Sequence, residues 1–520
     1  MRTKFSGAKF FDPATSSFRD SLVIEDGKVA AIDKFDEEIN FGGGFAFPAF
    51  RDGHCHPLFA GREADGPNVT SAKSVEEIVA IVREYRKKNP QINWIEGGAY
   101  DRSLVADGRF RAVWLDEATT EVPIVLHASD HHTIWVNSAA LSLLPNLLPT
   151  LRAGSVDQEN GAPLGVLREP EAMDLVLIHK PPRSLEQEVA SLVWADRLLA
   201  SFGIVQAQDA WITQGMTEVY IEAAKSKQLL LDYNLGFKID PSNWQQGLAS
   251  AIEARQLVLN EPSKKLNANT AKFFADGVFG SGTAAVIEPY LDDPNSFGEP
   301  LWKSDQLNLA TLEAAKLGFQ LHIHAIGDAG IRQALDAIEH VQHHHGATKL
   351  PSVIAHVELV SDQDLTRFAK LGVVANMQPL WAQADGMLLS CEPRLGKERL
   401  DAMYRMRDLK QTGARIAFGS DWPVSSANPL SGIATAISRE DEHGNPPGGW
   451  VIEQALSIEE ALKAYSSEVY FQLWGAEQPP LQVGSEADFF IVDENLLEIP
   501  AKRLREIRIQ STFKSGIQIF

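Results

Sequence analysis

The chain alternates short apolar runs with amphipathic segments of helical period, and this alternation limits the fold more than any other feature. Ten runs resemble buried strands. They are FAFPAFRDGH, NWIEGGAY, PIVLHASD, GIVQAQDA, LDYNLGFKI, TAKFFADG, FQLHIHAI, SVIAHVEL, VVANMQPL and RIAFGSDW. Helical segments such as LNLATLEAAKLG and AGIRQALDAIEHVQ lie between the later runs. Repeated strand–helix units predict an α/β fold with a parallel sheet, either closed into a barrel or open and doubly wound.

An eight-stranded barrel needs two runs fewer than the sequence offers. NWIEGGAY and PIVLHASD are the expected extras, because residues 137–200 that follow them are rich in proline, glycine and charge. We therefore predict a (β/α)8 TIM-type barrel over residues 50–479, with an insertion at about 60–200. The open doubly wound sheet is the alternative.

Both ends of the chain are β-like. FSGAKFFDP and SLVIEDGKVAAIDKF stand near the start, and ADFFIVDENL and IRIQSTFKSGIQIF stand near the end. Because the termini of a domain commonly lie close together, the two ends can build one small domain. The sequence predicts a composite β-sandwich from residues 1–49 and 480–520.

Composition restricts the partners. The formal net charge of -21 argues against a nucleic-acid partner, which needs a basic face. No segment approaches the roughly 18 uncharged apolar residues of a membrane helix, and the first residues lack the apolar centre of a signal peptide. We expect a cytoplasmic protein with a small-molecule substrate and no membrane partner. The oligomeric state stays open, with a homodimer among the options.

Polar residues stand near the carboxyl ends of the predicted barrel strands, where barrel enzymes build their sites. They are His54 and His56 on the first strand, Lys272 on the fourth, His322 and His324 on the fifth, His356 on the sixth and Asp421 on the eighth. Each has an ordinary structural interpretation; Lys272, for example, could pair with Asp276. Burying so many polar groups without partners is costly, so the joint pattern favours a site for zinc or a similar divalent ion.

Five motifs in order, FRDGHCHP, KFFADGVFGSGTAA, HIHAIGDAGI, IAHVELV and FGSDWPV, resemble the amidohydrolase superfamily. The resemblance is to its family-3 branch, which includes N-substituted formamide deformylase. It covers nearly the whole chain, including DHHTIWVNSAAL in the insertion and GSEADFFIVDENL near the end. It implies a (β/α)8 barrel with one or two divalent metal ions, zinc being expected, at the carboxyl end of the strands.

The resemblance also implies a ligand set. His54, His56 and Asp421 would bind the more buried ion, and His324 and His356 would bind the second. Lys272 would bridge both as an N-carboxylated lysine, since an ammonium cannot bind a cation whereas a carbamate is an anionic two-oxygen donor. His324 is preferred to His322, because it lies nearer the end of its strand and matches the family's H-A-x-G-D motif.

The predicted activity is hydrolysis of a C–N bond in an amide or formamide of a small organic molecule. A metal-bound water has its pKa lowered towards about 7, which supplies hydroxide at neutral pH. Asp421 would accept the proton of that water and deliver it to the departing nitrogen. The alternatives are a lyase, isomerase or decarboxylase of the same superfamily, or a degenerate protein that only binds a ligand.

Substrate contacts are predicted from polar and aromatic residues near strand ends and in the insertion. They are Tyr100, His132, Gln378, Trp381 and Trp422. His132 stands where the family usually has a histidine, with packing of the insertion as the alternative.

The densest histidine cluster, residues 343–345, is interpreted as a helix end with a surface role. Cys55 would face away from the two histidines that flank it, so it is interpreted as a packing residue. Cys391 has no paired histidine nearby in the sequence, so no thiol nucleophile is indicated.

Overall fold

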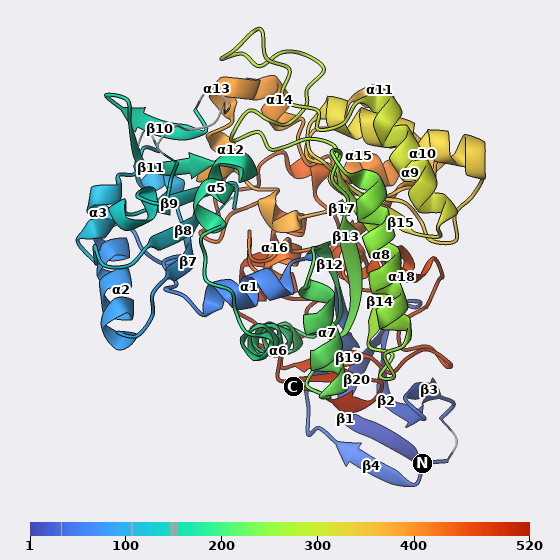
Figure 1. The fold of residues 1–520 in the computed structure, drawn as a ribbon. Helices are drawn as coiled ribbons and strands as arrows, with labels where there is room; N and C mark the ends of the chain where they lie inside the picture. Colours follow the sequence, from blue (N-terminus) through green and yellow to red (C-terminus); the bar gives the residue numbers. More distant parts are fainter. Residues whose placement is uncertain (33, 106–107, 130, 146–150, 152–153) are drawn as a thin grey trace. The chain divides into compact units, whose positions relative to one another are not determined.

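Eight short strands form one parallel sheet in which spatial order follows chain order (Figure 1). They are β6 (Phe50–Cys55), β12 (Ile204–Ile212), β13 (Asp232–Lys238), β14 (Leu266–Phe274), β15 (Gln320–Ala325), β16 (Val353–His356), β17 (Val374–Met377) and β18 (Arg415–Phe418). The computed structural model describes every residue except 33, 106–107, 130, 146–150 and 152–153.

The first and last strands of this sheet meet. The backbone N–H of Asp421 donates to the carbonyl oxygen of His54 at 2.7 Å, and the N–H of His56 donates to the carbonyl of Trp422 at 2.8 Å. A Cβ atom at Gly419 would lie 2.6 Å from Cβ of His54, so only glycine permits this approach. The sheet is therefore closed, which confirms the predicted barrel and makes the open-sheet alternative wrong.

One apolar run divides between two sheets. The sequence suggests a single strand over residues 45–54, but β5 (Phe45–Pro48) pairs with a terminal sheet and β6 begins the barrel. The N–H of Ala49, between them, donates to Asp488, whereas the N–H of Phe50 donates to Gly203 beside β12. The chain therefore changes partners at Ala49, directly after Pro48, and this proline is the mark in the sequence that the run is not one continuous strand.

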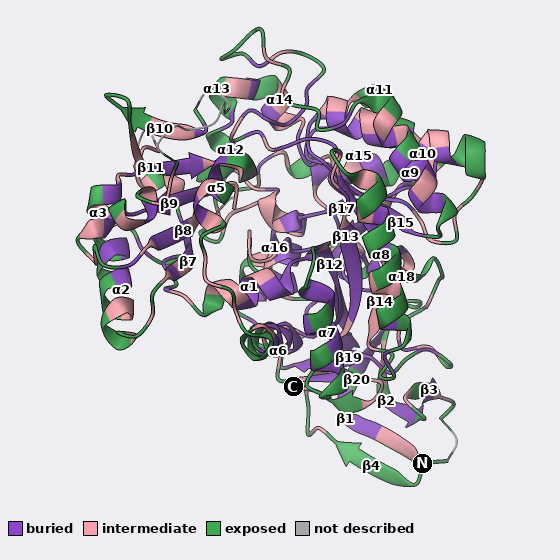
Figure 2. Ribbon diagram, viewed as in Figure 1, coloured by how far each residue is buried: buried purple, intermediate pink, exposed green. Residues whose placement is uncertain are grey.

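Helices follow the barrel strands and bury one face each (Figure 2). The main ones are α7 (Met216–Lys225), α8 (Trp244–Leu259), α9 (Ser304–Lys316), α10 (Asp328–His345), α11 (Asp362–Lys370), α15 (Met406–Gln411), α16 (Pro429–Ser438), α17 (Ile458–Ala464) and α18 (Ser467–Trp474). In α10 the buried apolar side chains recur at helical spacing, at Ile331, Leu335, Ile338 and Val341. The shorter elements are η2 (Pro379–Trp381), α12 (Gly386–Leu389), α13 (Glu392–Leu395), α14 (Lys397–Asp401), η3 (Ile452–Gln454) and α19 (Ala501–Leu504).

Strands from both chain ends share a second sheet. Its order is β21 (Ile517–Gln518), β20 (Ser511–Lys514), β19 (Phe489–Val492), β5, β1 (Arg2–Asp12), β2 (Ser17–Glu25) and β3 (Lys28–Ala30), with β4 (Glu37–Asn40) paired to β1. Its core is aromatic: Phe489 stacks on Phe513 with ring centroids 4.6 Å apart, and Phe5 and Phe10 pack edge-on against Phe489.

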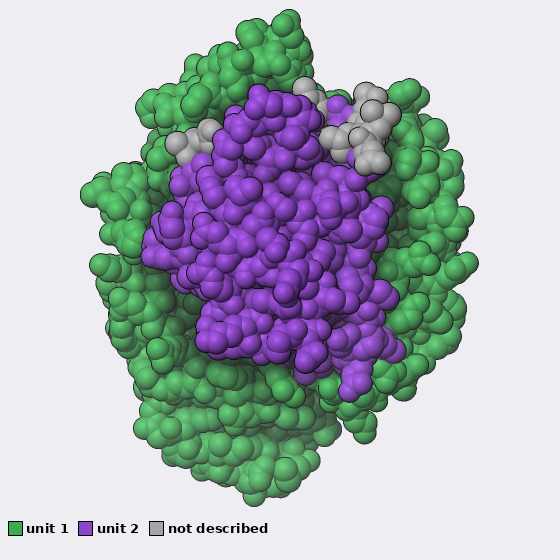
Figure 3. Space-filling model, turned by 60° about the vertical axis from the view of Figure 1, so that its left-hand side comes forward, with its two compact units in different colours: residues 1–56, 196–520 green, residues 57–195 purple. Residues whose placement is uncertain are grey.

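The described chain divides into two compact units, residues 1–56 with 196–520 (unit 1) and residues 57–195 (unit 2) (Figure 3). Unit 2 holds a sheet of order β10 (Val156–Glu159), β11 (Ala162–Arg168), β9 (Thr133–Val136), β8 (Ile124–Ala128) and β7 (Ile95–Tyr100). The two extra runs of the sequence are β7 and β8. Helices in or entering this unit are α1 (Pro57–Ala64), α2 (Val75–Lys88), η1 (Arg102–Leu104), α3 (Ala112–Asp116), α4 (Ser138–Leu141), α5 (Glu169–Leu177) and α6 (Leu185–Ser201). None of the helices that the structure describes is long and apolar enough to span a bilayer.

Candidate functional site

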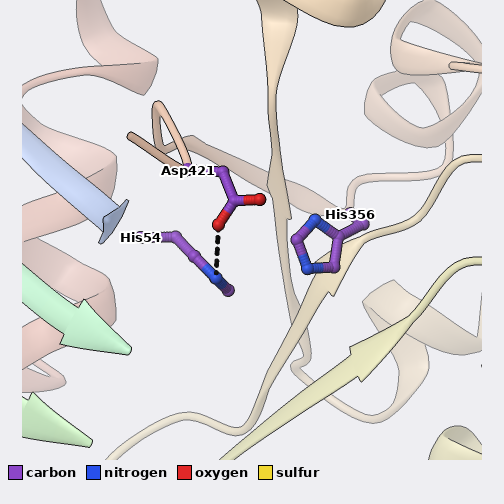
Figure 4. A group of neighbouring side chains, drawn as sticks. All are labelled: His54, His356 and Asp421. Carbon is purple, nitrogen blue, oxygen red and sulfur yellow. Dashed lines mark ion pairs between the residues drawn. The ribbon is translucent and has the colours of Figure 1, made fainter. Parts of the chain in front are cut away.

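Three side chains from distant parts of the sequence meet at the carboxyl end of the barrel. His54 near the end of β6, His356 at the end of β16 and Asp421 just after β18 each offer one donor atom, and these atoms lie within 4.8 Å of one another (Figure 4). All three residues are buried. Parallel strands present their carboxyl ends on the same side of a barrel, so residues hundreds of positions apart converge there.

The carboxylate of Asp421 binds both histidines of the first strand. Its Oδ1 lies 2.9 Å from Nε2 of His56 and 3.2 Å from Nε2 of His54. On the other edge of the His56 ring, Nδ1 lies 3.7 Å from Oδ1 of Asp209. Burial alone would lower the pKa of His56, but the nearby carboxylates of Asp209 and Asp421 outweigh it and raise that pKa to about 9. The two carboxylates therefore make this position favourable for a cation.

Most of the other imidazoles in the group are held neutral. Burial lowers the pKa of His54, His322 and His356 well below the usual value, and the nearby Lys272 amine lowers it further. The ring of His324 lies 4.4 Å from that of His356, centroid to centroid. A neutral imidazole is the form that binds a metal ion, so the local environment favours ligation over protonation.

A chain of buried amides orients His356. Nδ1 of His356 lies 2.9 Å from Oε1 of Gln378, whose Nε2 lies 3.2 Å from Oδ1 of Asn376. Nδ2 of Asn376 lies 2.8 Å from Oε1 of Gln472, whose Nε2 lies 2.8 Å from the carbonyl oxygen of Gly53.

The carbonyl of Gly53 can only accept a hydrogen bond, and this fixes the direction of every link. Gln472 must donate to it, Asn376 to Gln472, Gln378 to Asn376, and His356 to Gln378. The proton of His356 therefore resides on Nδ1, and Nε2 carries the free electron pair. This is the arrangement of a metal-binding histidine whose second nitrogen donates to a neighbouring oxygen.

His54 has a similar support from another histidine. Its Nδ1 lies 2.9 Å from Nε2 of His322, and His322 is fully buried. For Nε2 of His54 to bind a cation, its proton must lie on Nδ1, and His322 is placed to accept that hydrogen bond. The sequence offers His322 and His324 on one strand, and the family motif favours His324 as the ligand. In the structure, His322 contacts His54, and His324 lies beside His356.

Lys272 lies inside the barrel with its side chain fully buried. Among the described residues its Nζ has no hydrogen-bond partner, and it stands 4.8 Å from the ring centre of Phe274. Burial lowers its pKa to about 7, against the opposing attraction of Asp421. The structural alternative, a pair with Asp276, is not formed within the described chain: that carboxylate accepts backbone N–H groups of Ile326, Gly327 and Ala285 instead.

Two carboxylates near the site were not singled out from the sequence. Asp52 accepts the backbone N–H groups of His54 and Ser420 at 3.1 and 3.0 Å, so it joins β6 to the segment after β18. Asp209 reaches His56 from the end of β12. The sequence feature that could have identified both is a carboxylate inside or at the end of an apolar run. Many helix-capping residues share this feature.

The aromatic residues named from the sequence divide between the units. In unit 1, the indole of Trp381 stacks on His356 with centroids 5.6 Å apart and planes inclined by 2°. Trp422 is half-buried and directly follows Asp421. Trp211, which the sequence did not single out, lies edge-on to His56 at 6.1 Å. Gln378 is buried and its amide is used by His356 and Asn376.

In unit 2, Tyr100 is fully buried and packs against Phe110 and Trp135 in the core of that unit. Nδ1 of His132 lies 3.0 Å from Oε2 of Glu169. Substrate contacts by Tyr100 and His132 stay predictions.

The donor set fits a divalent metal ion. It combines imidazoles that burial holds neutral, a carboxylate bound to two of the histidines, and a buried amine without a hydrogen-bond partner in the described structure. Imidazole nitrogen and carboxylate oxygen are the ligands of catalytic zinc and related ions. Such an ion would compensate the negative charge of Asp421 and Asp209.

Comparisons with known proteins bear on the fold and the family of the chain. The chain is 26% identical to Protein LONG AFTER FAR-RED 3 of Arabidopsis thaliana, over 99% of this chain and 91% of that protein. It is 23% identical to N-substituted formamide deformylase of Arthrobacter pascens, over 92% and 89%. The fold is similar to the crystal structure of an uncharacterized metal-dependent hydrolase from Pyrococcus horikoshii, with a TM-score of 0.78, 23% identity, and 96% and 99% of the two chains covered. The model of the amidohydrolase family matches residues 37–520, and the chain therefore belongs to that family.

Proposed function

We propose that this protein is a metal-dependent hydrolase that cleaves a C–N bond in an amide or formamide of a small organic molecule. The observation that carries the proposal is the buried group of His54, His356 and Asp421 at the carboxyl end of the barrel. The choice of bond is supported by the family and by the similarity to a protein named as an N-substituted formamide deformylase.

The ligand assignment follows the donors. His54, His56 and Asp421 would hold one ion, His324 and His356 a second, and Lys272 would contribute to both. Zinc is the ion we propose, because it accepts this mixture of nitrogen and oxygen ligands. When bound, such an ion acts as a Lewis acid that polarises the scissile carbonyl and lowers the pKa of a water molecule.

Lys272 would take part as a carbamate. Its neutral amine attacks carbon dioxide: one N–C bond forms, one C–O π bond opens to give the carboxylate, and the proton lost by the nitrogen passes to water. A buried amine thereby becomes an anion with two donor oxygens. The fully buried Nζ without a hydrogen-bond partner among the described residues, and its pKa of about 7, support this step.

Carboxylation of Lys272 predicts a carbamate signal in carbon-13 NMR of protein equilibrated with labelled carbon dioxide and metal. Lys272→Met keeps a similar length and volume but has no amine, so the signal should be absent in that variant. A wild-type spectrum without a protein carbamate signal would contradict the modification.

Asp421 has the geometry of a proton carrier. Its carboxylate is buried, is held by His54 and His56 through Oδ1, and lies where the donor atoms of three strands meet. It would accept the proton of the attacking water and deliver it to the nitrogen that leaves. Trp211, Trp381 and Trp422 would offer apolar surface to the substrate.

The deciding experiment assays the zinc-loaded full chain against amides, formamides, lactams and ureas, with the chelator-treated protein as control. Turnover of at least one class by the loaded protein, lost on chelation, is the expected result. A chain that binds one or two ions and turns over nothing in the panel would favour a lyase, isomerase or decarboxylase. Well under one tightly bound ion per chain would favour a ligand-binding protein.

A further inference from the structure

We infer that the carboxyl-terminal end of α10 carries a second, surface site for a transition-metal ion, with His340 and His344 as its ligands. The sequence drew attention only to the consecutive residues His343, His344 and His345, whose side chains point in different directions around a helix. The useful partner is His340, four residues before His344 and therefore one turn away on the same face.

The two rings lie side by side. The centroids of His340 and His344 are 4.1 Å apart with their planes inclined by 29°, whereas the ring of His343 is 6.5 Å from that of His344. His344 is exposed and His340 half-buried, so both are accessible and His344 can rotate. Two histidines at this spacing on one helical face form a known type of chelating pair.

One ring already has the bond that a ligand histidine needs. Nδ1 of His344 lies 2.9 Å from the backbone carbonyl of His340, and since a carbonyl can only accept, this nitrogen carries the proton. Nε2 of His344 is then the nitrogen with the free electron pair. Metal-binding histidines characteristically donate their other N–H to such an oxygen.

The charge environment also favours a cation. The helix ends at His345 with Gly346 as its cap, and the unpaired carbonyls of a helix carboxyl terminus give it a partial negative charge.

This site is separate from the barrel site. α10 begins at Asp328, just after β15, and His340 lies 12 residues further along the helix. At about 1.5 Å per residue the histidine pair lies roughly 18 Å along the axis from the end that adjoins the barrel mouth. The proposal therefore does not depend on the proposed catalytic function.

The two imidazole donors indicate which metal ions would bind. Two imidazoles suit copper, nickel or zinc, and affinity along this series is expected to be highest for copper. Water would complete the coordination.

The test is retention of the full chain, without an affinity tag, on a column of immobilised Ni²⁺. An ion fixed to a resin reaches exposed side chains but cannot enter the buried barrel site. The wild type should be retained, and His340→Ala and His344→Ala should elute at clearly lower imidazole concentration. His345→Ala removes an adjacent exposed histidine outside the pair and should elute with the wild type.

A second measurement does not depend on the resin. Free Ni²⁺ should raise the Tm of the zinc-loaded wild type and of His345→Ala, and this rise should be absent in His344→Ala. The proposal is wrong if His344→Ala elutes and melts like the wild type, or if His345→Ala loses as much retention as His344→Ala. Neither the column retention nor the Tm depends on catalytic turnover.

Discussion

At the scale of single residues, Asp421 combines two properties that ordinarily oppose each other. Its carboxylate is buried, which raises the pKa, yet the hydrogen bond and charge of His56 outweigh burial and lower that pKa below the usual value. The side chain therefore stays ionised inside the barrel. An ionised, buried carboxylate can both bind a cation and accept a proton.

Asp421→Asn tests that role with little change in shape. An amide cannot accept the proton of an attacking water, so turnover should fall by about 10²–10⁴-fold, the usual contribution of general acid–base catalysis. The variant should still fold, because the substitution leaves the shape of the side chain unchanged. Turnover within a few-fold of the wild type, in a folded variant, would refute the assignment.

His322 is a positioning residue, because it acts through His54. Nε2 of His322 lies 2.9 Å from Nδ1 of His54, so replacing His322 leaves that nitrogen of the proposed ligand without its hydrogen-bond partner. His322→Phe should weaken metal binding by about 10–100-fold, as is typical for supporting partners of metal ligands. His322→Gln, whose amide oxygen can accept the same bond, should recover part of the loss.

The readout for His322 is the Kd of the metal, measured by competition with a chelator, rather than activity. Equal affinity in His322→Phe and the wild type would show that the contact between the two rings does not support binding.

At the scale of elements, the site depends on strands and a helix that contribute no ligand. β17 supplies Asn376, the residue after it is Gln378, and α18 supplies Gln472. Together they connect His356 of β16 to the carbonyl of Gly53 in β6. Because the last acceptor is a backbone carbonyl, the orientation of every amide in the series is determined.

Gln472→Leu removes the link that sets this direction. Asn376 could then turn over, His356 would no longer be held with its proton on Nδ1, and metal affinity should fall by about tenfold or more. The variant should also lose roughly 1–3 kcal/mol of folding free energy, because buried amide groups lose their partners. Chelator competition and thermal unfolding measure the two effects separately.

Gln206→Leu is the matched control. Gln206 is a buried barrel amide that bonds to Asn234 and Trp474. Within the described part of the chain it has no hydrogen bond to the amides that lead to His356. It should lose comparable stability while keeping its metal affinity. A similar fall in affinity in both variants would mean that general loosening of the barrel, and not the direction of the amides, is responsible.

At the scale of the whole molecule, the two units have separate cores. The proposed metal donors all belong to unit 1, and they lie in or directly after β6, β14, β15, β16 and β18. Unit 2 is built around its own cluster of buried aromatic and aliphatic side chains, including Tyr100, Phe110 and Trp135. Loss of a metal ion should therefore lower the stability of unit 1 far more than that of unit 2.

Chelation tests this division. An ion at 100 times its Kd stabilises the folded state by about 2.7 kcal/mol, so removing it should lower the Tm, and added zinc should restore it. Backbone hydrogen exchange should accelerate in β6 and β16 while β7 and β8 change little. Equal acceleration in both units, or none in either, would contradict the placement of the ion.

The hydrophobic pattern of the chain predicted the barrel, with an open sheet as the alternative, and the motifs predicted most of the proposed donors. Parallel strands repeat with a recognisable hydrophobic pattern, and their carboxyl ends must meet, so His54, His356 and Asp421 could be expected to converge before any coordinates were known. The end of α10 at the histidine cluster was also predictable, because Gly346 follows the last periodic residue.

Tertiary structure alone decided which side chains support those donors. The contact of His322 with His54, the reach of Asp209 to His56 and the bond of Gln472 to Asn376 join residues 96 to 268 positions apart. No spacing in the sequence encodes these contacts, because they depend on the rotamers of side chains from different elements. At the change of sheet near Ala49, Pro48 marks an interruption in the sequence, but only the tertiary structure shows that one half pairs with β19 and the other with β12.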